Sequence, residues 1–231
     1  TAAQPNSSTS RRKISICSAT GAGKARNIMD DFLRVADFCP QTAAFVPQPV
    51  CVLWLQGCLR NCPGCCAPMW QNPSDGEIRS IQEVLQWILD ARTGGLVVSG
   101  GEPLMQCGPL EKLMRQIPES AGMGKILYTG YTWPEVLQDP ARQKVSTHFD
   151  VLVCGPYIEE QNDSKGLRGS SNQEVIFQTS RYIDCKKIFL QEPRRVEVEI
   201  HPEFTRVVGI APAGMNLDFN HSAGGQRVVI D

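Results

Sequence analysis

The chain has 231 residues, of which 42% are hydrophobic and 20% charged, and its formal net charge is −1 at pH 7. This composition is typical of a globular protein and excludes a mainly disordered or membranous chain. The charge provides no basic field for nucleic acid or anionic lipid, and no apolar run of about eighteen residues predicts a membrane span, so we expect neither kind of partner.

The N-terminal part, residues 1–45, is predicted to be an arm followed by a short helix. Its first 26 residues are polar and rich in serine, with no apolar segment behind the basic residues, which predicts a flexible arm and not a secretory signal. Residues 27–38 are predicted to form the helix, which Pro40 would break.

Residues 46–192 are predicted to form an α/β core in which short apolar strands alternate with helices. Ser80 and Glu83 have the spacing of a capping box, which predicts that a helix begins there. The remaining predicted elements are strands at 50–55, 96–98, 125–128 and 151–153, a helix at 104–117 and a helix beginning at 134. This alternation favours a parallel sheet or a partial barrel.

The C-terminal part, residues 193–231, is predicted to be a β-hairpin with a tail. Residues 196–200 alternate in polarity with a period of two, and residues 205–210 are predicted to pair with them. Between the core strands and this hairpin, residues 155–173 are polar and rich in glycine, which predicts a long loop.

The cysteines provide the strongest chemical signal. Four of the ten lie within nine positions, and Cys58, Cys62 and Cys65 have the spacing C-x3-C-x2-C. Three thiolates on one tight loop can each bind one iron of a four-iron, four-sulfur cubane and leave the fourth iron open for substrate. A structural zinc site would need a fourth ligand, such as Cys66 or a distant cysteine, and stays open as an alternative.

Gln56-Gly57-Cys58 followed by Cys62-Pro63-Gly64-Cys65 resembles the cluster loop of radical S-adenosylmethionine (SAM) enzymes, in particular the anaerobic ribonucleotide reductase activating proteins. The resemblance covers roughly residues 50–175. It implies a partial (β/α) barrel of the radical SAM type, and the C-terminal β-hairpin predicted from the alternation at 196–200 would be added to it. It also implies two cofactors, a [4Fe-4S] cluster and SAM, which an electron from the cluster cleaves to a 5′-deoxyadenosyl radical that abstracts hydrogen from a substrate.

Further motifs of this family follow in order, and the resemblance implies that they bind SAM. Ser99-Gly100-Gly101-Glu102-Pro103 resembles the segment that meets the methionine amino group, and a TGYT segment and an RGSSNQ segment follow. The implied SAM-binding residues are Ser99, Gly100, Gly101, Glu102, Thr129, Gly130, Arg168, Ser170 and Asn172. Independently of the resemblance, the cysteine loop and the segments 99–102, 129–130 and 154–155 each follow a predicted strand, so they should meet at one rim of a parallel sheet.

The chain departs from the family pattern near the cluster and on the substrate side. Residues 45–49 replace the usual Asn-Gly-Pro-Gly segment, Cys66 replaces an aromatic residue, and Cys154 replaces an acidic one. No single catalytic residue is assigned from the sequence. The roles of Cys66 and Cys154, the electron donor and the substrate are not fixed by the sequence.

Three functions follow as hypotheses. The first is an activase that installs a glycyl radical on a partner protein, and the second is a radical SAM enzyme that modifies a small molecule or peptide. The third is a non-catalytic iron–sulfur or zinc protein. The enzymatic hypotheses imply an electron donor such as flavodoxin or ferredoxin, and the clustered thiols predict a reducing, cytoplasmic location.

Overall fold

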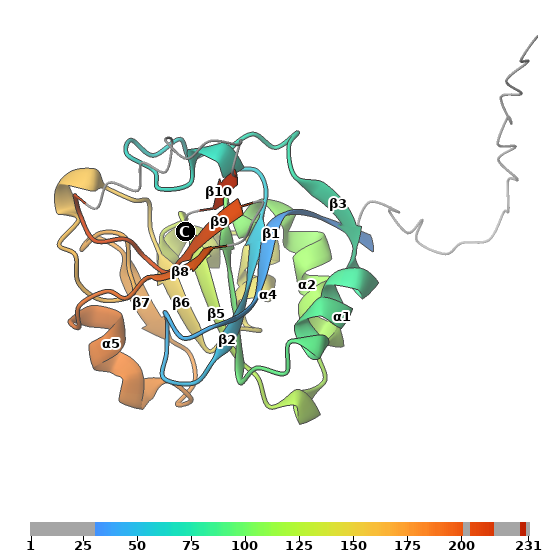
Figure 1. Cartoon of the computed structure of the whole chain (residues 1–231). Coiled ribbons are helices and arrows are strands. Elements are labelled where there is room, and N and C mark those ends of the chain that lie inside the picture. The colour runs from blue at the N-terminus through green and yellow to red at the C-terminus, as the bar shows by residue number, and fades with distance from the viewer. Residues whose placement is uncertain (1–30, 201–203, 215–226, 230–231) are drawn as a thin grey trace, which may run out of the picture.

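The structure is a computed structural model that describes residues 31–200, 204–214 and the backbone of 227–229. The predicted arm, residues 1–30, lies outside the described residues. The described chain forms a seven-stranded sheet in the order β3-β1-β2-β4-β5-β6-β7 and a three-stranded sheet in the order β10-β9-β8 (Figure 1).

The bounds of the elements follow the predicted alternation over most of the core. The strands are β1 (Phe32–Thr42), β2 (Val50–Leu55), β3 (Glu77–Ser80), β4 (Gly95–Gly100), β5 (Gly124–Thr129), β6 (Val151–Cys154), β7 (Glu174–Phe177), β8 (Glu197–Ile200), β9 (Phe204–Val208) and β10 (Arg227–Val229). The helices are α1 (Ile81–Asp90), α2 (Cys107–Gln116), α3 (Trp133–Gln138), α4 (Pro140–Ser146) and α5 (Lys186–Leu190). The capping box at the start of α1 is confirmed, because the Ser80 hydroxyl accepts from the Glu83 N–H and the Glu83 carboxylate accepts from the Ser80 N–H.

The centre of the large sheet is parallel, which confirms the α/β class. Strands β2, β4, β5 and β6 pair in parallel, while β1, β3 and β7 are antiparallel additions at the two sides. All six residues of β2 are buried, as expected for a parallel strand that is covered on both faces. Within the described ranges the sheet ends at β3 and β7, which do not pair with each other.

The predicted helix at 27–38 is wrong over its described part, because β1 begins at Phe32. This strand pairs with β2 on one side and with β3 on the other. Its side chains Leu33 and Cys39 are fully buried in the sheet. The stabilisation from this burial outweighs the local preference for a helix that the sequence pattern indicated. Pro40 falls where the register with β2 shifts, a position at which a strand tolerates proline. The boundaries at residues 45 and 192 stay predictions.

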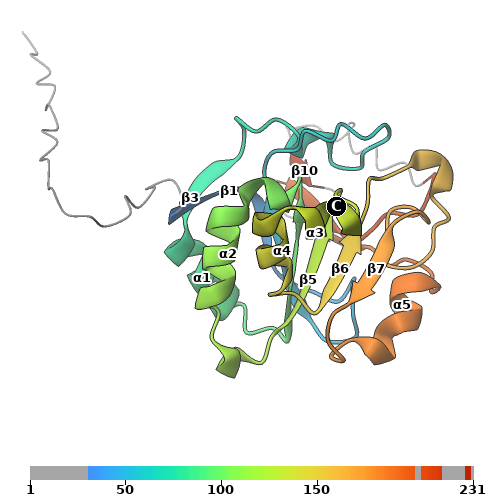
Figure 2. The ribbon, with the colours of Figure 1, turned by 180° about the vertical axis from the view of Figure 1, so that it is seen from behind.

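Each face of the large sheet has its own covering layer. Helices α1 to α4 lie on one face, in front of the sheet in Figure 2. Their apolar side chains, including Val84 and Leu113, pack with Leu53 and Leu127 of the sheet. On the other face, Trp54 packs with Trp70, and Phe189 of α5 and Val208 of β9 belong to the same buried cluster.

The predicted C-terminal hairpin is confirmed by the antiparallel pairing of β8 with β9. Strand β10 pairs in parallel with β9, so the tail contributes a strand that the sequence did not predict (Figure 1). The Glu197 carboxylate accepts hydrogen bonds from the Thr42 hydroxyl and the Ala43 N–H, which joins β8 to the end of β1. Arg206 of β9 forms ion pairs with Asp37 and Glu199. The small sheet is therefore fixed to the core by polar contacts as well as by burial.

The buried thiols away from the predicted cluster loop are expected to resist alkylation. Burial raises the pKa of Cys39 from 9.0 to about 12, and it raises the pKa of Cys154 to about 12 as well. The thiolate fraction of each at neutral pH should therefore fall about a thousandfold. Mass spectrometry of the metal-free protein after brief iodoacetamide treatment should find the exposed Cys66 modified and these two intact. Equal labelling of all three would contradict this burial.

Candidate functional site

A cavity of about 170 Å³ lies at the carboxyl ends of the parallel strands β2, β4 and β5. It brings together the three predicted cluster cysteines and six of the nine predicted SAM-binding residues. Its lining comprises Cys58, Arg60, Cys62, Cys65, Cys66, Ala67, Ser99, Gly100, Gly101, Glu102, Tyr128, Thr129, Gly130, Gly155, Tyr157, Asn162, Gly169, Gln173, Arg194, Ile210 and Ala211. The expected meeting of separate strand-end segments at one rim is therefore confirmed, while their binding roles stay predictions.

The cysteine loop leaves β2 through a backbone that is held on both sides. The N–H of Gly57, whose φ is +100°, donates to the Trp70 carbonyl at 2.8 Å, and the N–H of Cys58 donates to the Gln71 carbonyl at 2.8 Å. The Gln56 side chain also donates to the Asn72 carbonyl at 2.9 Å. These bonds close the loop before its thiols are reached, so the positions of the cysteines depend on the fold and not only on a bound metal.

The glycine pair at the end of β4 is required by the approach of this loop. A Cβ at Gly101 would lie 2.4 Å from the Gly57 carbonyl oxygen, and one at Gly100 would lie 2.4 Å from the Leu55 oxygen. The same two segments are joined by hydrogen bonds, because the Gly101 N–H donates to the Leu55 carbonyl and the Glu102 N–H donates to the Gly57 carbonyl. The pair therefore joins the predicted SAM segment directly to the cysteine loop.

Glu102 joins the end of β4 to the end of β5. Its side chain is buried, and one carboxylate oxygen accepts from the Leu104 N–H at 2.9 Å and the Thr129 hydroxyl at 2.8 Å. The other oxygen accepts from the Gly130 N–H at 2.7 Å. Burial raises the pKa of this carboxyl, and the three donors oppose that shift. The Glu102 carboxylate thus holds Thr129 and Gly130 in the cavity wall.

Arg60 extends from the cysteine loop to the helix side of the rim. Its guanidinium lies 4.2 Å from the centre of the Tyr131 ring and donates to the Glu135 carboxylate at 2.8 Å. Glu135 also accepts from the Thr132 N–H at the start of α3, and these bonds lower its pKa. Arg142 lies 3.7 Å from the centre of the same Tyr131 ring. The loop that carries the cysteines is therefore fastened to α3 through an arginine and an aromatic ring.

Replacing Arg60 by alanine is expected to lower the free energy of unfolding by about 1 kcal/mol, because a stacking contact and a partly exposed ion pair are both lost. Urea unfolding measures this, with Arg115→Ala as the control, since the Arg115 side chain is 67% exposed and its ion pair with Glu111 is long, at 3.8 Å. An Arg60 variant as stable as the Arg115 variant would show that the contact contributes nothing to stability.

The loop over residues 155–173 presents different residues to the cavity from those the resemblance implies. Arg168 pairs with Asp163 at 2.9 Å and donates to the Ser171 carbonyl, while the buried Ser170 hydroxyl accepts from the Ile158 N–H. Asn172 donates to the Pro156 carbonyl at 2.8 Å. These three side chains are not among the cavity lining and hold the loop together; a direct contact with SAM stays a prediction for them.

The structure adds cavity residues that the sequence did not single out. Gln173 donates to the Gly155 carbonyl at 2.8 Å and accepts from the Gly169 N–H at 2.7 Å, so it shapes the wall from within the loop. Tyr157 accepts from the Asn162 side chain at 3.1 Å. Arg194 comes from beyond the loop. A signal existed for Arg60, which lies inside the cysteine motif, but none existed for Arg194.

The donor set of the cavity fits an iron–sulfur cluster. The thiols of Cys58, Cys62 and Cys65 are half-buried on one loop and line one cavity. A hydrogen bond from Cys66 lowers the pKa of Cys65 from 9.0 to about 6, and burial raises the pKa of Cys58. Among the described residues, no group of three or more His, Cys, Asp or Glu side chains is placed so that it could hold one metal ion. The thiolates of a cubane bind different iron atoms and so do not converge on one point.

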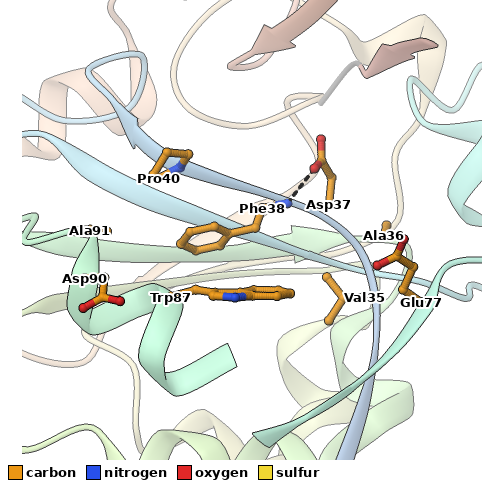
Figure 3. Close-up of a pocket in the computed structure, with 9 residues that line it drawn as sticks. All are labelled: Val35, Ala36, Asp37, Phe38, Pro40, Glu77, Trp87, Asp90 and Ala91. Carbon is orange, nitrogen blue, oxygen red and sulfur yellow. Dashed lines mark hydrogen bonds between the residues drawn. The ribbon is translucent and has the colours of Figure 1, made fainter. Parts of the chain in front are cut away.

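A second, roomier cavity of about 490 Å³ lies between β1 and α1 and contains none of these groups. The Phe38 and Trp87 rings are 5.7 Å apart between their centres, with Asp37, Glu77 and Asp90 around them (Figure 3). Asp37 is paired with Arg206 and Glu77 with Arg79, so the charges at its rim are largely neutralised within the chain. The cysteine-lined cavity is therefore the candidate functional site.

The chain is an iron–sulfur enzyme of the radical SAM class, and the three thiols beside the glycine-rich ends of parallel strands are its candidate cluster site. A family described as "4Fe-4S single cluster domain" matches residues 49–176. The anaerobic ribonucleoside-triphosphate reductase-activating protein of Vibrio cholerae is 35% identical over 140 residues, covering 56% of this chain and 88% of that protein. The protein of the same name from Escherichia coli K12 is 31% identical over 143 residues, with the same coverage. The chain therefore belongs to the 4Fe-4S single cluster domain family, in the group of the anaerobic ribonucleotide reductase-activating proteins.

Two more distant similarities were also found. The activating protein of enterobacteria phage T4 is 27% identical over 139 residues, covering 57% of this chain and 86% of the phage protein. The crystal structure of QueE from Escherichia coli aligns with a TM-score of 0.33 and 16% identity, over 48% of this chain and 58% of that one. That TM-score is too low to decide the fold. None of the helices in the described ranges has the length and hydropathy needed to cross a bilayer.

Proposed function

We propose that this enzyme cleaves SAM reductively at a [4Fe-4S] cluster held by Cys58, Cys62 and Cys65. When bound, the cluster and SAM supply a 5′-deoxyadenosyl radical, which abstracts hydrogen from a substrate. The observation that carries the proposal is the single cavity that contains the three thiols and the segments 99–102 and 129–130. We also infer that the open sheet is the partial (β/α) barrel of the radical SAM type, and that the enzyme works in the reducing cytoplasm.

The chain's own residues contribute position and exclusion of water. Gly101 keeps the SAM segment against the cysteine loop, and Glu102 fixes Thr129 and Gly130 beside it. The Glu102 carboxylate accepts from three donors and has about four acceptor positions, which leaves one position on its second oxygen for a methionine ammonium. The half-buried thiols restrict water around the cluster, which affects its potential.

Radical formation is tested by reconstituting the protein anaerobically with iron and sulfide, then adding dithionite and SAM and measuring 5′-deoxyadenosine. We expect the product from the natural chain and from a Cys185→Ala control, whose thiol does not line the cavity, and none from Cys62→Ala. A cluster-loaded protein that releases no 5′-deoxyadenosine would refute the enzymatic proposal and favour a non-catalytic iron–sulfur protein.

We propose a glycyl-radical protein as the substrate, because the relatives are named as activators of anaerobic ribonucleoside-triphosphate reductase. An electron donor such as flavodoxin or ferredoxin would reduce the cluster. Mixing the reduced, SAM-loaded enzyme with such a reductase should produce a glycyl radical visible by electron paramagnetic resonance. Abundant 5′-deoxyadenosine without that signal would favour the alternative, modification of a small molecule or a peptide.

A further inference from the structure

Arg194 is a buried arginine outside the residues that the family description covers. It follows the bridge between Lys165 and Pro193, and its side chain has no exposed surface. The family match ends at residue 176, yet Arg194 and the segment Ile210 to Ala211 line the same cavity as the cysteines. Part of the site is therefore built by the C-terminal region.

The guanidinium of Arg194 joins two segments of the cavity wall. One nitrogen donates to the Asn162 side-chain oxygen at 2.8 Å and to the Ala211 carbonyl at 2.9 Å. The other donates to the Arg168 carbonyl at 2.6 Å and to the Gly169 carbonyl at 2.9 Å. Three of these partners, Asn162, Gly169 and Ala211, line the cavity themselves. Four acceptors arranged around one planar group suit a guanidinium and not the compact ammonium of lysine.

Other contacts show that the C-terminal segment is fixed where Arg194 holds it. The Ala213 N–H donates to the Ser164 hydroxyl at 2.8 Å. Gly209, with φ +112°, passes so close to the Arg195 carbonyl that a Cβ would lie 2.3 Å from its oxygen. Val207 and Val208, just before this turn, are fully buried. The segment Ile210–Ala211 is therefore anchored before and after it in the chain, and Arg194 adds a hydrogen bond within it, to the Ala211 carbonyl.

We propose that Arg194 is a positioning residue that fixes the C-terminal segment Ile210–Ala211 as a wall of the SAM cavity. This inference rests on the proposed function, because it takes the cysteine-lined cavity as the place where SAM binds. Arg194 itself donates its hydrogen bonds to the wall and acts through Gly169 and Ala211. A preorganised wall lowers the cost of ordering the loop when SAM binds, so its loss should weaken binding before it affects the cluster.

The test compares Arg194→Lys with Arg195→Lys in the 231-residue chain, because Arg195 is adjacent and exposed. We expect Arg194→Lys to weaken SAM binding by the reconstituted enzyme about tenfold, as lost charge-assisted hydrogen bonds imply. Hydrogen exchange of peptides that contain Ala213 should become faster in the Arg194 variant and stay unchanged in the Arg195 variant. The iron content should be equal in both variants. Weaker SAM binding by the Arg194 variant could then not be caused by loss of the cluster.

The outcomes distinguish this inference from the proposed function. If the natural chain carries a cluster but binds no SAM, the proposed function fails, and this inference fails with it. If the natural chain binds SAM and Arg194→Lys binds it equally well, only the inference about Arg194 is overturned. Faster exchange with unchanged SAM affinity would also overturn it, because Arg194 would then support the fold and not the cavity.

Discussion

Replacing Glu102 by alanine is expected to lower the free energy of unfolding by about 3 kcal/mol, since two buried donors and one half-buried donor lose their acceptor. The donors are the N–H groups of Leu104 and Gly130 and the Thr129 hydroxyl. Urea unfolding of the metal-free protein measures the loss, with the exposed Glu160→Gln as the control.

Glu102→Gln separates shape from hydrogen bonding. Each carboxylate oxygen accepts from a main-chain N–H, so whichever way the amide of glutamine is turned, its NH₂ group faces a donor. We therefore expect a loss of about 1 to 3 kcal/mol from this nearly isosteric change. A glutamine variant as stable as the natural chain would contradict the assignment of both oxygens as acceptors.

The raised pKa of Glu102 gives this comparison a pH dependence of known sign. Because burial raises the folded-state pKa above 4.5, the unfolded chain ionises first as the pH rises, and this group's contribution to stability then falls. Glutamine does not titrate. The stability advantage of the natural chain over Glu102→Gln should therefore shrink as the pH increases above about 4.5.

The parts of the fold that the sequence predicted well are those with strong local patterns. The buried run of β2 and the capping box of α1 each specify an element through neighbouring residues alone. Strand β1 was missed because its pairing with β2 and β3, which lie later in the chain, determines its conformation.

The candidate site also has features that follow from local sequence patterns and features that depend on contacts between distant segments. The strand-end motifs predicted which segments meet, since parallel strands place their carboxyl ends at one rim. They did not predict that the Gly57 carbonyl leaves no room for a side chain at Gly101, or that the Glu102 carboxylate accepts hydrogen bonds from the cavity wall. Both contacts depend on distances between strands. Arg194 could not be found from the sequence, since its acceptors are mostly backbone carbonyls, which leave no mark in the side chains.

Replacing Cys62 by alanine is expected to lower the iron bound per chain after anaerobic reconstitution by about tenfold or more. Even the mutation of residues that only support metal ligands lowers metal affinity about 10- to 100-fold, and Cys62 is proposed to bind iron directly. Iron analysis and the visible absorbance of the cluster measure this without any enzymatic assay. Cys185→Ala is the matched control, because its half-buried thiol does not line the cavity.

Cys66→Ala then decides how many thiolates the site uses. Cys66 also lines the cavity, so the structure alone would allow it as a fourth ligand. A three-thiolate cluster with an open iron predicts that Cys66→Ala retains its iron while the Cys58, Cys62 and Cys65 variants lose it. Equal loss in all four variants would instead indicate a closed site with four thiolates, as in structural zinc proteins, and a site of that kind has no open position for SAM.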